Sequence, residues 1–292
     1  MFQITRFLTL LTTIYAILLF ANYHYSLAAK EHEAEENIKI IEAVLIENFE
    51  QVERVLCSIG RRINEKSPSL NLAEIHQVFL QTSASQGYRD IFSWSLFDWV
   101  NLEGYQTVNT MFGIRKNPDL VAASRNYRHP SNESWKLILS VPAIGNPSNT
   151  YIIPVGVQIE TKNRQRAGTV SAGISIKKLV NAVVSRIDKN SRFLVIDNRN
   201  EQLVFGSYDI GDNPKQNFSD VFLEKLPVPK SNEYLLSKNM AVTYPYTIKV
   251  GYDKKQLWRE VRFSSVQTLI QITAIALIIL LFVGRKKVKT PV

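Results

Sequence analysis

The stretch IKIIEAVLIENFEQVERVLCSIGRRI, Ile38–Ile63, carries an apolar residue at every third or fourth position. That spacing lies between helical periods of about 3.5 and 3.6 residues and predicts one long helix with a single apolar stripe. Such a stripe can pack on its own domain, on a second copy of the chain, or on both, and we predict a homodimer through it. The stripe consists of Ile38, Ile41, Leu45, Phe49, Val52, Leu56, Ile59 and Ile63.

The single cysteine of the chain, Cys57, lies one residue beyond this stripe. A chain with one cysteine forms no intrachain disulfide and builds no cysteine-rich zinc or iron–sulfur site. We interpret Cys57 as a small residue on the flank of the helix rather than a redox switch, because the chain offers it no partner thiol.

Two uncharged apolar runs lie near the ends of the chain, FLTLLTTIYAILLFA at Phe7–Ala21 and VQTLIQITAIALIILLFVG at Val266–Gly284. A helix of about 19 residues is roughly 28 Å long, close to the hydrocarbon thickness of a bilayer. Arg6 precedes the first run and a basic cluster follows the second. Because basic flanks stay on the cytoplasmic side, the sequence predicts two membrane spans, both termini inside and the central segment outside.

A second interpretation stays open for the first run. Ser26-Leu27-Ala28 resembles the small-residue site that signal peptidase cuts, and Phe7–Phe20 is short enough to be the apolar core of a signal peptide. Cleavage there leaves a protein anchored only at its C-terminus, with the central segment facing the same way.

The composition of the 292 residues, 45% hydrophobic and 21% charged, is typical of a globular protein and excludes disordered or collagen-like chains. The formal net charge is +9, from 35 Lys and Arg against 26 Asp and Glu. All the acids lie within Lys30–Arg262, whereas five of the bases lie outside it, so more than half of the excess is terminal. A nucleic-acid binder concentrates its charge on one face of the folded body, and we therefore expect no nucleic-acid partner.

Between the two apolar runs the pattern changes from helix to strand. Strands are expected at Ile91–Asp98, Tyr105–Asn109, Lys136–Val141, Tyr151–Glu160 and Gly168–Ile176, and short helices near Glu74–Gln81, from Asn117 through Arg125, and at Lys177–Ile187. These elements predict a small antiparallel sheet with a pocket between the sheet and the helices.

The pattern then partly repeats. Arg192–Asp197 and Gln202–Phe205 predict a hairpin, Asp220–Leu226 a helix, and Tyr234–Ser237, Met240–Thr243 and Thr247–Gly251 further strands before a helix from Lys254. The sequence thus predicts an α+β chain with two sheet modules between two membrane helices. The expected divisions are 1–29 for the first span, 30–90 for the long helix and a connector, 91–187 and 188–264 for the two modules, 265–284 for the second span and 285–292 for a basic tail.

Several short motifs of the first module carry a family resemblance. They are Leu96-Phe97-Asp98 with Glu103-Gly104, Asp119-Leu120, Ser124-Arg125-Asn126-Tyr127, Tyr151-Ile152-Ile153-Pro154-Val155 and Gly168-Thr169-Val170. They resemble the membrane-distal module of double Cache (PDC, PAS-like) extracytoplasmic sensor domains, and Tyr246–Asp253 resembles the end of the membrane-proximal module. The resemblance covers roughly Ile38–Arg262. It implies a receptor of the bacterial inner membrane whose periplasmic domain binds a small ligand and moves the helices that enter the membrane.

The resemblance also implies a ligand site. In such sensors an Arg-x-Tyr pair lines the pocket, and a guanidinium with a neighbouring phenol suits a carboxylate. Two alternatives stay open. The basic residues before Pro130 can be solvated groups on a loop, and the aromatic residues of the strands can belong to the core. The candidate ligand-binding residues are Arg125, Tyr127 and Arg128 as donors, and Trp94 and Tyr151 as pocket walls.

The chain departs from the family pattern in two ways. Amine and amino-acid sensors of this family usually carry an acid on the last strand of the pocket, whereas Gly168–Ile176 holds none, so we expect a small carboxylate or another anion as ligand. Such receptors normally continue into a kinase, cyclase or methyl-accepting domain, whereas this chain stops at Val292. We therefore expect a separate kinase or cyclase output partner or, alternatively, a truncated non-signalling remnant, a scaffold or a membrane-anchored binding protein.

Sequence motifs of enzymes and metal sites are missing. The four histidines are scattered, and none forms an i, i+4 metal pair. Gly168–Gly173 has one residue too many before its serine for a nucleophile elbow, and Ser175–Lys178 matches Ser-x-x-Lys without the companion motifs. We therefore expect no catalysis, no cofactor and no metal.

Overall fold

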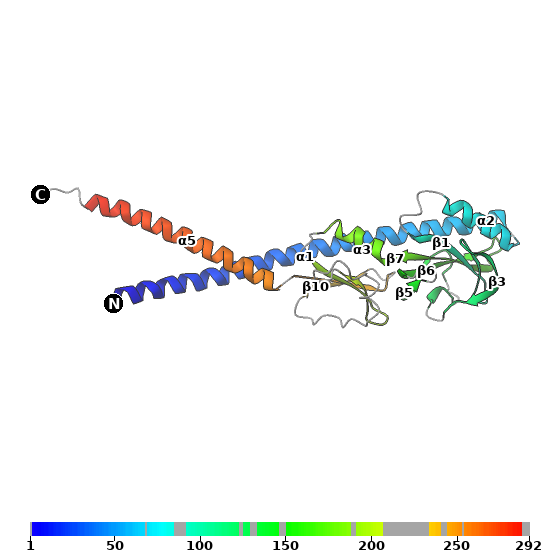
Figure 1. Cartoon of the computed structure of the whole chain (residues 1–292), viewed down its shortest axis with the longest axis horizontal. Helices are drawn as coiled ribbons and strands as arrows, with labels where there is room; N and C mark the ends of the chain where they lie inside the picture. The colour runs from blue at the N-terminus through cyan, green and yellow to red at the C-terminus, as the bar shows by residue number, and fades with distance from the viewer. Residues whose placement is uncertain are drawn as a thin grey trace.

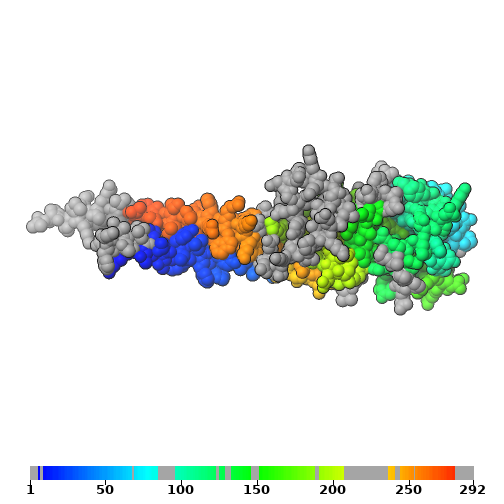
Figure 2. Space-filling view, turned by 60° about the horizontal axis from the view of Figure 1, so that its bottom comes forward, coloured from blue at the N-terminus to red at the C-terminus, as the bar shows by residue number. Residues whose placement is uncertain are grey.

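Helix α1, Phe2–Lys66, runs along the length of the structure, and both β-sheets lie against it (Figure 1). This computed structural model describes residues 2–67, 69–84, 92–122, 125–128, 133–145, 150–187, 191–206, 234–240, 244–252 and 254–287. The shape is elongated, with the two terminal helices side by side at one end and the first sheet at the other (Figure 2). A long helix with sheets along one side therefore confirms the predicted α+β class.

Helix α2, Leu72–Ser83, follows α1 after a short turn and packs back on it. Its N-terminus is capped by Asn71, whose side chain accepts a hydrogen bond from the backbone N–H of Ala73 at 2.9 Å. The apolar side of α2 is buried against the first sheet, so α1 and α2 together cover one face of this sheet.

The first sheet lies at the end of the molecule farthest from the termini (Figure 1). Among the described residues it has seven strands in the order β3-β2-β1-β7-β6-β4, with β5 also paired to β6, and all pairs are antiparallel. The strands are β1 Phe92–Val100, β2 Tyr105–Asn109, β3 Gly113–Leu120, β4 Leu137–Leu139, β5 Ala143–Gly145, β6 Thr150–Glu160 and β7 Arg166–Ser175. The 3₁₀ turn η2, Asn126–Arg128, crosses one face, and helix α3, Ile176–Val184, follows β7.

The second sheet lies between the first sheet and the terminal helices. In the described part of the chain it has four antiparallel strands in the order β10-β11-β8-β9. The strands are β8 Arg192–Asp197, β9 Gln202–Gly206, β10 Tyr234–Asn239 and β11 Tyr246–Gly251. Helix α5, Lys254–Lys287, starts shortly after β11.

The apolar stripe of α1 is the centre of one hydrophobic core that includes residues of both sheets. Each of its eight residues from Ile38 to Ile63 is at most 5% exposed. The long helix is confirmed, but dimerisation through this stripe was the wrong prediction, because the chain's own sheets already cover it. A homodimer of this chain has to use another face.

Cys57 lies on the same helix and is also buried. Its thiol donates a hydrogen bond to the carbonyl oxygen of Trp135 at 3.2 Å, and burial raises the thiol pKa to about 11, with the charge of Glu53 adding to the rise. A protonated, covered thiol is a structural group, which agrees with its interpretation as a residue of the helix flank.

Three predicted elements of the sheets differ in the structure. Of the helix expected from Asn117 through Arg125, the first four residues belong to β3, an edge strand where Pro118, which has no N–H, is tolerated. The strand expected over Lys136–Val141 is shorter and covers only Leu137–Leu139 as β4, and the separate strand β5, Ala143–Gly145, was not expected. Met240 lies outside any strand, and the helix expected at Asp220–Leu226 lies outside the described residues.

The N-terminal part of α1 and α5 are long and apolar enough to cross a membrane, by length and composition. They touch near the second sheet, where the Asn22 amide donates to the Ser265 hydroxyl at 2.9 Å and Tyr23 stacks on Trp258 at 4.9 Å between ring centroids. The two helices are therefore joined by specific contacts at the ends of their apolar runs that lie nearest the second sheet.

Candidate ligand-binding site

The first sheet has a cavity of about 390 Å³ on the face opposite α1. Strands β1, β2, β3, β5, β6 and β7 contribute residues to its wall, and Val121, Ala122, Arg125 and Tyr127 also line it. This volume lies within the range of small-molecule sites, about 300–1,000 Å³. Four charged side chains line it, namely Asp98, Arg115, Asp119 and Arg125.

Strand alternation decides which residues reach the cavity. In β6, Ile152 and Pro154 line it, whereas Ile153 and Val155 are fully buried in the core beneath α1. In β1, Asp98 lines it, whereas its neighbours Phe97 and Trp99 belong to the core. The same sheet therefore has one apolar face for the core and one face with polar groups for a ligand.

Asp98 lies at the centre of the cavity wall. Its Oδ1 atom accepts hydrogen bonds from the side-chain amides of Gln106 and Asn109, both on β2. Asn109 is itself fixed, because its Oδ1 atom accepts from the backbone N–H of Met111 at 2.7 Å. Burial raises the pKa of Asp98, and the two amides and the charge of Arg115 oppose that rise. The cavity therefore contains a carboxyl group that is costly to ionise.

Arg125 and Tyr127 lie on the opposite side of the cavity, at the η2 turn. The turn is fixed by backbone hydrogen bonds of 2.9 Å from Arg125 N–H to Ala122 and from Arg128 N–H to Arg125. The Nη1 atom of Arg125 is buried and has no hydrogen-bond partner among the described residues. A buried guanidinium donor without an acceptor is costly, and a bound anion removes that cost.

The Tyr127 side chain is 7% exposed and packs on Gly156 of β6. Burial raises its pKa to about 12, the charge of Asp98 adds to the rise, and the charge of Arg125 opposes it. Tyr127 is therefore a neutral phenol at physiological pH. Tyr127, Asp98, Arg125 and Ser171 all line the same cavity.

The rim of the cavity carries an ion pair on β3 between Arg115 and Asp119. The Asp119 side chain is 76% exposed, whereas that of Arg115 is 21% exposed. Of the described residues, Asp98 and Arg125 thus line the cavity without an ion pair between them, and the rim holds the Arg115–Asp119 ion pair. The four charges sum to about zero when Asp98 is ionised.

The structure brings two of the five candidate residues into the cavity, Arg125 and Tyr127. Tyr151 is not among its lining residues and packs against the core on the other face of the sheet. Arg128 is also outside the lining and lies over Gly104, with its Cγ atom 3.2 Å from the place of a Cβ there. The side chain of Trp94 lies outside the described part of the structure.

Comparison with known proteins gives similarity in structure only. No protein-family model matches the chain, and no curated protein matches its sequence. The sensory domain of the Campylobacter jejuni chemoreceptor Tlp3 with isoleucine bound superposes with a TM-score of 0.54 at 10% identity, over 82% of this chain and 98% of that one. The extracellular domain of a protein described as a histidine kinase, vpHK1S-Z8, gives 0.57 at 12% identity, over 80% and 98%. A domain of a protein assigned to the sensory box/GGDEF family of Vibrio parahaemolyticus gives 0.50 at 13% identity, over 81% and 99%.

The fold of this chain is that of these sensory and extracellular domains. The Tlp3 domain is the sensory part of its chemoreceptor. Among the described residues, no group of three or more His, Cys, Asp or Glu side chains is placed to hold a metal ion.

Asp98, Gln106, Asn109 and Arg115 are the site residues that the sequence interpretation missed. Strand β7 carries no acid over Gly168–Ile176, but an acid lies beside it on the neighbouring strand β1, because Asp98 pairs directly with Ser171. Gln106 and Asn109 are three residues apart, so regular alternation would place them on opposite faces of β2, and a register shift in the β1–β2 pair accompanies their shared contact with Asp98. The pairing of β1 with β7 joins distant parts of the chain and leaves no local signal.

We expect the stability of the Asp98→Asn variant to depend on pH differently from that of the wild type. Because burial raises the pKa of Asp98, the folded chain binds this proton more tightly than the unfolded chain. Ionised Asp98 therefore costs stability at neutral pH, and the cost fades as the pH falls through the folded pKa towards about 4. Asparagine keeps an acceptor for the two amides without the charge. The melting temperature of the variant relative to wild type should be highest near pH 7.5 and fall towards pH 4.

The matched control for this measurement is Asp119→Asn, since that carboxylate is largely exposed. Its melting temperature should follow that of the wild type across the pH range, within a few tenths of a kcal/mol in stability. An Asp98→Asn difference that does not change with pH, or that grows on acidification, contradicts a raised pKa at this site.

Proposed function

We propose that this chain is the periplasmic sensor of a bacterial inner-membrane signalling system and binds a small carboxylate in the cavity of its first sheet. The observation that carries the proposal is the buried Nη1 atom of Arg125, which lines an open cavity without a partner among the described residues. Arginine can hold a carboxylate with two parallel hydrogen bonds. The neutral hydroxyl of Tyr127 is a further donor nearby.

The open cavity favours this function over a non-signalling remnant. A remnant under no selection for binding is expected to fill its pocket or to pair Arg125 with an internal acid. Instead, the acid of the inner cavity is held by Gln106 and Asn109, and the other acid is paired with Arg115. Gln106 and Asn109 thus hold the Asp98 carboxyl, while the Nη1 atom of Arg125 keeps no acceptor among the described residues, as a site for an anionic ligand requires.

The position of Asp98 widens the proposed ligand class. A carboxylate held at Arg125 leaves Asp98 free to accept from an ammonium group through its second oxygen. Such a pairing is consistent with the amino acids named with the Tlp3 domain, isoleucine and L-valine. We therefore include amino acids with simple carboxylates as ligand candidates, and the measurement below separates them.

The proposed arrangement places α1 and α5 across the membrane with both termini in the cytoplasm and the two sheets in the periplasm. The apolar character of both helices supports it, and so do the basic residues near the two chain termini. We further propose that 91–187 and 188–264 act as distal and proximal modules. Ligand binding can move α5 only through a difference in affinity between two states of these modules, which a kinase or cyclase partner then reads.

The test is thermal unfolding of the full-length chain in detergent micelles, followed by tryptophan fluorescence. The panel contains acetate, propionate, succinate, the common amino acids and simple amines. A ligand at about a hundredfold excess over its Kd adds about 2.7 kcal/mol of stability. We expect at least one carboxylate or amino acid to stabilise the wild type and Arg125→Ala to lose that effect.

Arg128→Ala is the matched control, because Arg128 is adjacent in sequence but lies outside the cavity lining. It should keep the full ligand effect. Stabilisation by amines alone, or by an acid equally in wild type and Arg125→Ala, contradicts binding of a carboxylate at Arg125. Amino acids that act while simple acids do not would assign the ammonium contact to Asp98.

A further inference from the structure

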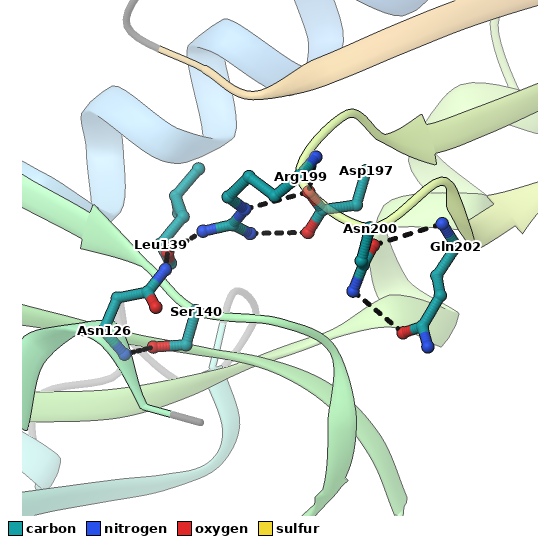
Figure 3. A network of polar contacts seen from close by, with 7 residues as sticks. All are labelled: Asn126, Leu139, Ser140, Asp197, Arg199, Asn200 and Gln202. Atoms are coloured by element: carbon teal, nitrogen blue, oxygen red, sulfur yellow. Dashed lines mark hydrogen bonds and ion pairs between the residues drawn. The ribbon is translucent and has the colours of Figure 1, made fainter. Parts of the chain in front are cut away.

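Arg199 joins the two sheets through a single side chain (Figure 3). It lies in the turn after β8, where its Nε and Nη2 atoms bind both carboxylate oxygens of Asp197, at 2.9 and 2.5 Å. Its Nη1 atom reaches across to the first sheet and donates to the carbonyl oxygen of Leu139 on β4, at 2.6 Å. Because the Asp197 side chain is fully buried, the guanidinium is held in one orientation.

The Leu139 carbonyl oxygen that accepts from Arg199 also accepts a hydrogen bond from Asn126, beside the candidate ligand site. The side-chain amide of Asn126 donates to the same oxygen at 2.8 Å, and the backbone N–H of Asn126 donates to the Ser140 hydroxyl at 2.9 Å. A carbonyl oxygen has two lone pairs, so Arg199 and Asn126 together satisfy this one. Asn126 lies between Arg125 and Tyr127, and its two bonds fix the turn that carries both.

The same short segment also supports the cavity wall. The backbone N–H of Ser140, a fully buried residue, donates to the carbonyl of Pro154 at 2.9 Å, and Pro154 lines the cavity. Leu139 and Ser140 are thus the point where the η2 turn, strand β6 and the second sheet meet. Any shift of this segment changes the distance between Arg125 and the opposite wall.

On the other side, Asp197 is directly coupled to the strand before α5. Asp197 pairs with Tyr246 in the β8–β11 ladder, and the next residue, Asn198, donates its N–H to the Pro245 carbonyl at 2.8 Å. Strand β11 then leads into α5. Two hydrogen bonds, from Asn126 to the Leu139 carbonyl and from Arg199 to the same carbonyl, therefore connect the ligand site to the sheet that precedes the C-terminal helix.

We propose that Arg199 is a positioning residue for the ligand site, which it reaches through the Leu139 carbonyl and Asn126. The inference rests on the proposed function, because it assigns the residue that ties this site to the second sheet. Linkage makes the tie reciprocal: a ligand that holds the η2 turn also stabilises the contact of Arg199, and loss of that contact loosens the turn. Arg199 and Asn126 do not touch the ligand in this arrangement.

The test uses amide hydrogen exchange of the full-length chain in detergent micelles and needs no ligand. In Arg199→Gln we expect the amides of Asn126, Arg128 and Ser140 to exchange about tenfold faster, as for the loss of one charged hydrogen bond. In Asn126→Ala we expect faster exchange at the Arg199 amide, which donates to Asp197 at 3.0 Å. Arg199→Lys keeps a cation that can donate to Leu139 and should restore part of the protection.

The matched control is Asn200→Ala in the same turn. Within the described part of the chain its side chain bonds to Gln202, with its amide donating at 3.0 Å and its Oδ1 atom accepting at 3.1 Å, and it does not reach the first sheet (Figure 3). The three distal amides should keep wild-type rates in this variant. Unchanged rates in folded Arg199→Gln, or the same acceleration in Asn200→Ala, overturn the proposal.

A purely structural role for Arg199 gives a different result. It lowers the global stability, so amides in the cores of both sheets speed up together, and local acceleration at the η2 turn is absent. Because no ligand is used, this experiment can succeed while the ligand panel shows nothing, and it can fail while Arg125-dependent binding stands. The failure of the proposed function and the failure of this inference are therefore separable.

Discussion

Phe49→Ala is expected to lower the free energy of unfolding by about 3–5 kcal/mol. Phe49 is the residue of the α1 stripe where the second sheet packs, it is 0% exposed, and its ring lies 5.1 Å from Tyr244 and 5.8 Å from Tyr246 between centroids. Truncation removes most of a buried aromatic side chain and leaves a cavity that neither the helix nor the sheet can fill without moving.

The measurement is thermal unfolding of the full-length chain in detergent micelles, where a loss of this size lowers the melting temperature by about 10 °C. Glu50→Ala is the control on the same helix turn. Glu50 is exposed and forms only a surface pair with Arg54 at 3.6 Å, so its loss should change the stability by less than about 0.5 kcal/mol. Equal effects of the two substitutions contradict the packing of the second sheet on this stripe.

The long helix was predictable because its signal is local and repeated. Each of the eight stripe residues from Ile38 to Ile63 follows the last by three or four positions, and all eight are buried. What covers the stripe was not predictable, since a period reports that a face is apolar and not which surface lies on it. The helix packs on its own sheets, so the stripe is not available as the interface of the expected homodimer.

Local chemistry misled the sequence interpretation at Asn117-Pro118-Asp119. An Asn-Pro-Asp sequence has the residues that begin a helix, with a capping side chain and a proline at the first turn. In the structure Gln106 of β2 pairs with Asp119, and Ile114 with Val108, so pairing along the strand decides the conformation. The ladder shifts register between these pairs, and this irregular edge accommodates the proline.

Some residues of the candidate site could be predicted from local sequence and others could not. Arg125 and Tyr127 were predicted because they form a short motif, and both line the cavity. Asp98 was quoted within a motif without a role, since its meaning depends on the strands beside it. Asp98 lies opposite Ser171, and its carboxylate accepts hydrogen bonds from Gln106 and Asn109. Only the assembled sheet shows these neighbours. Tyr151 illustrates the reverse case, where strand parity places a plausible aromatic wall on the core face.

Gly156→Ala is expected to displace Tyr127 and to remove ligand binding together with about 1–3 kcal/mol of stability. A methyl group at Gly156 comes within 2.7 Å of the Tyr127 Cβ and Cγ atoms and 2.9 Å of Thr169 Cγ2. These are atoms near the backbone, which cannot swing aside as the end of a long side chain can. Tyr127 therefore has to leave its place, and the η2 turn that also carries Arg125 has to move with it.

Gly173→Ala separates this effect from a general intolerance of alanine in the sheet. Gly173 lines the same cavity, but the only close contact of a methyl group there is Ile152 Cδ1 at 2.7 Å, the flexible end of a side chain. Its stability should change by less than about 1 kcal/mol, while the Tyr127 environment stays as in the wild type. Since burial sets the raised pKa of Tyr127, a phenol titration followed by ultraviolet absorbance reports its position directly. In Gly156→Ala one tyrosine should titrate closer to 10, whereas a wild-type titration curve in this variant means that Tyr127 is not held by Gly156.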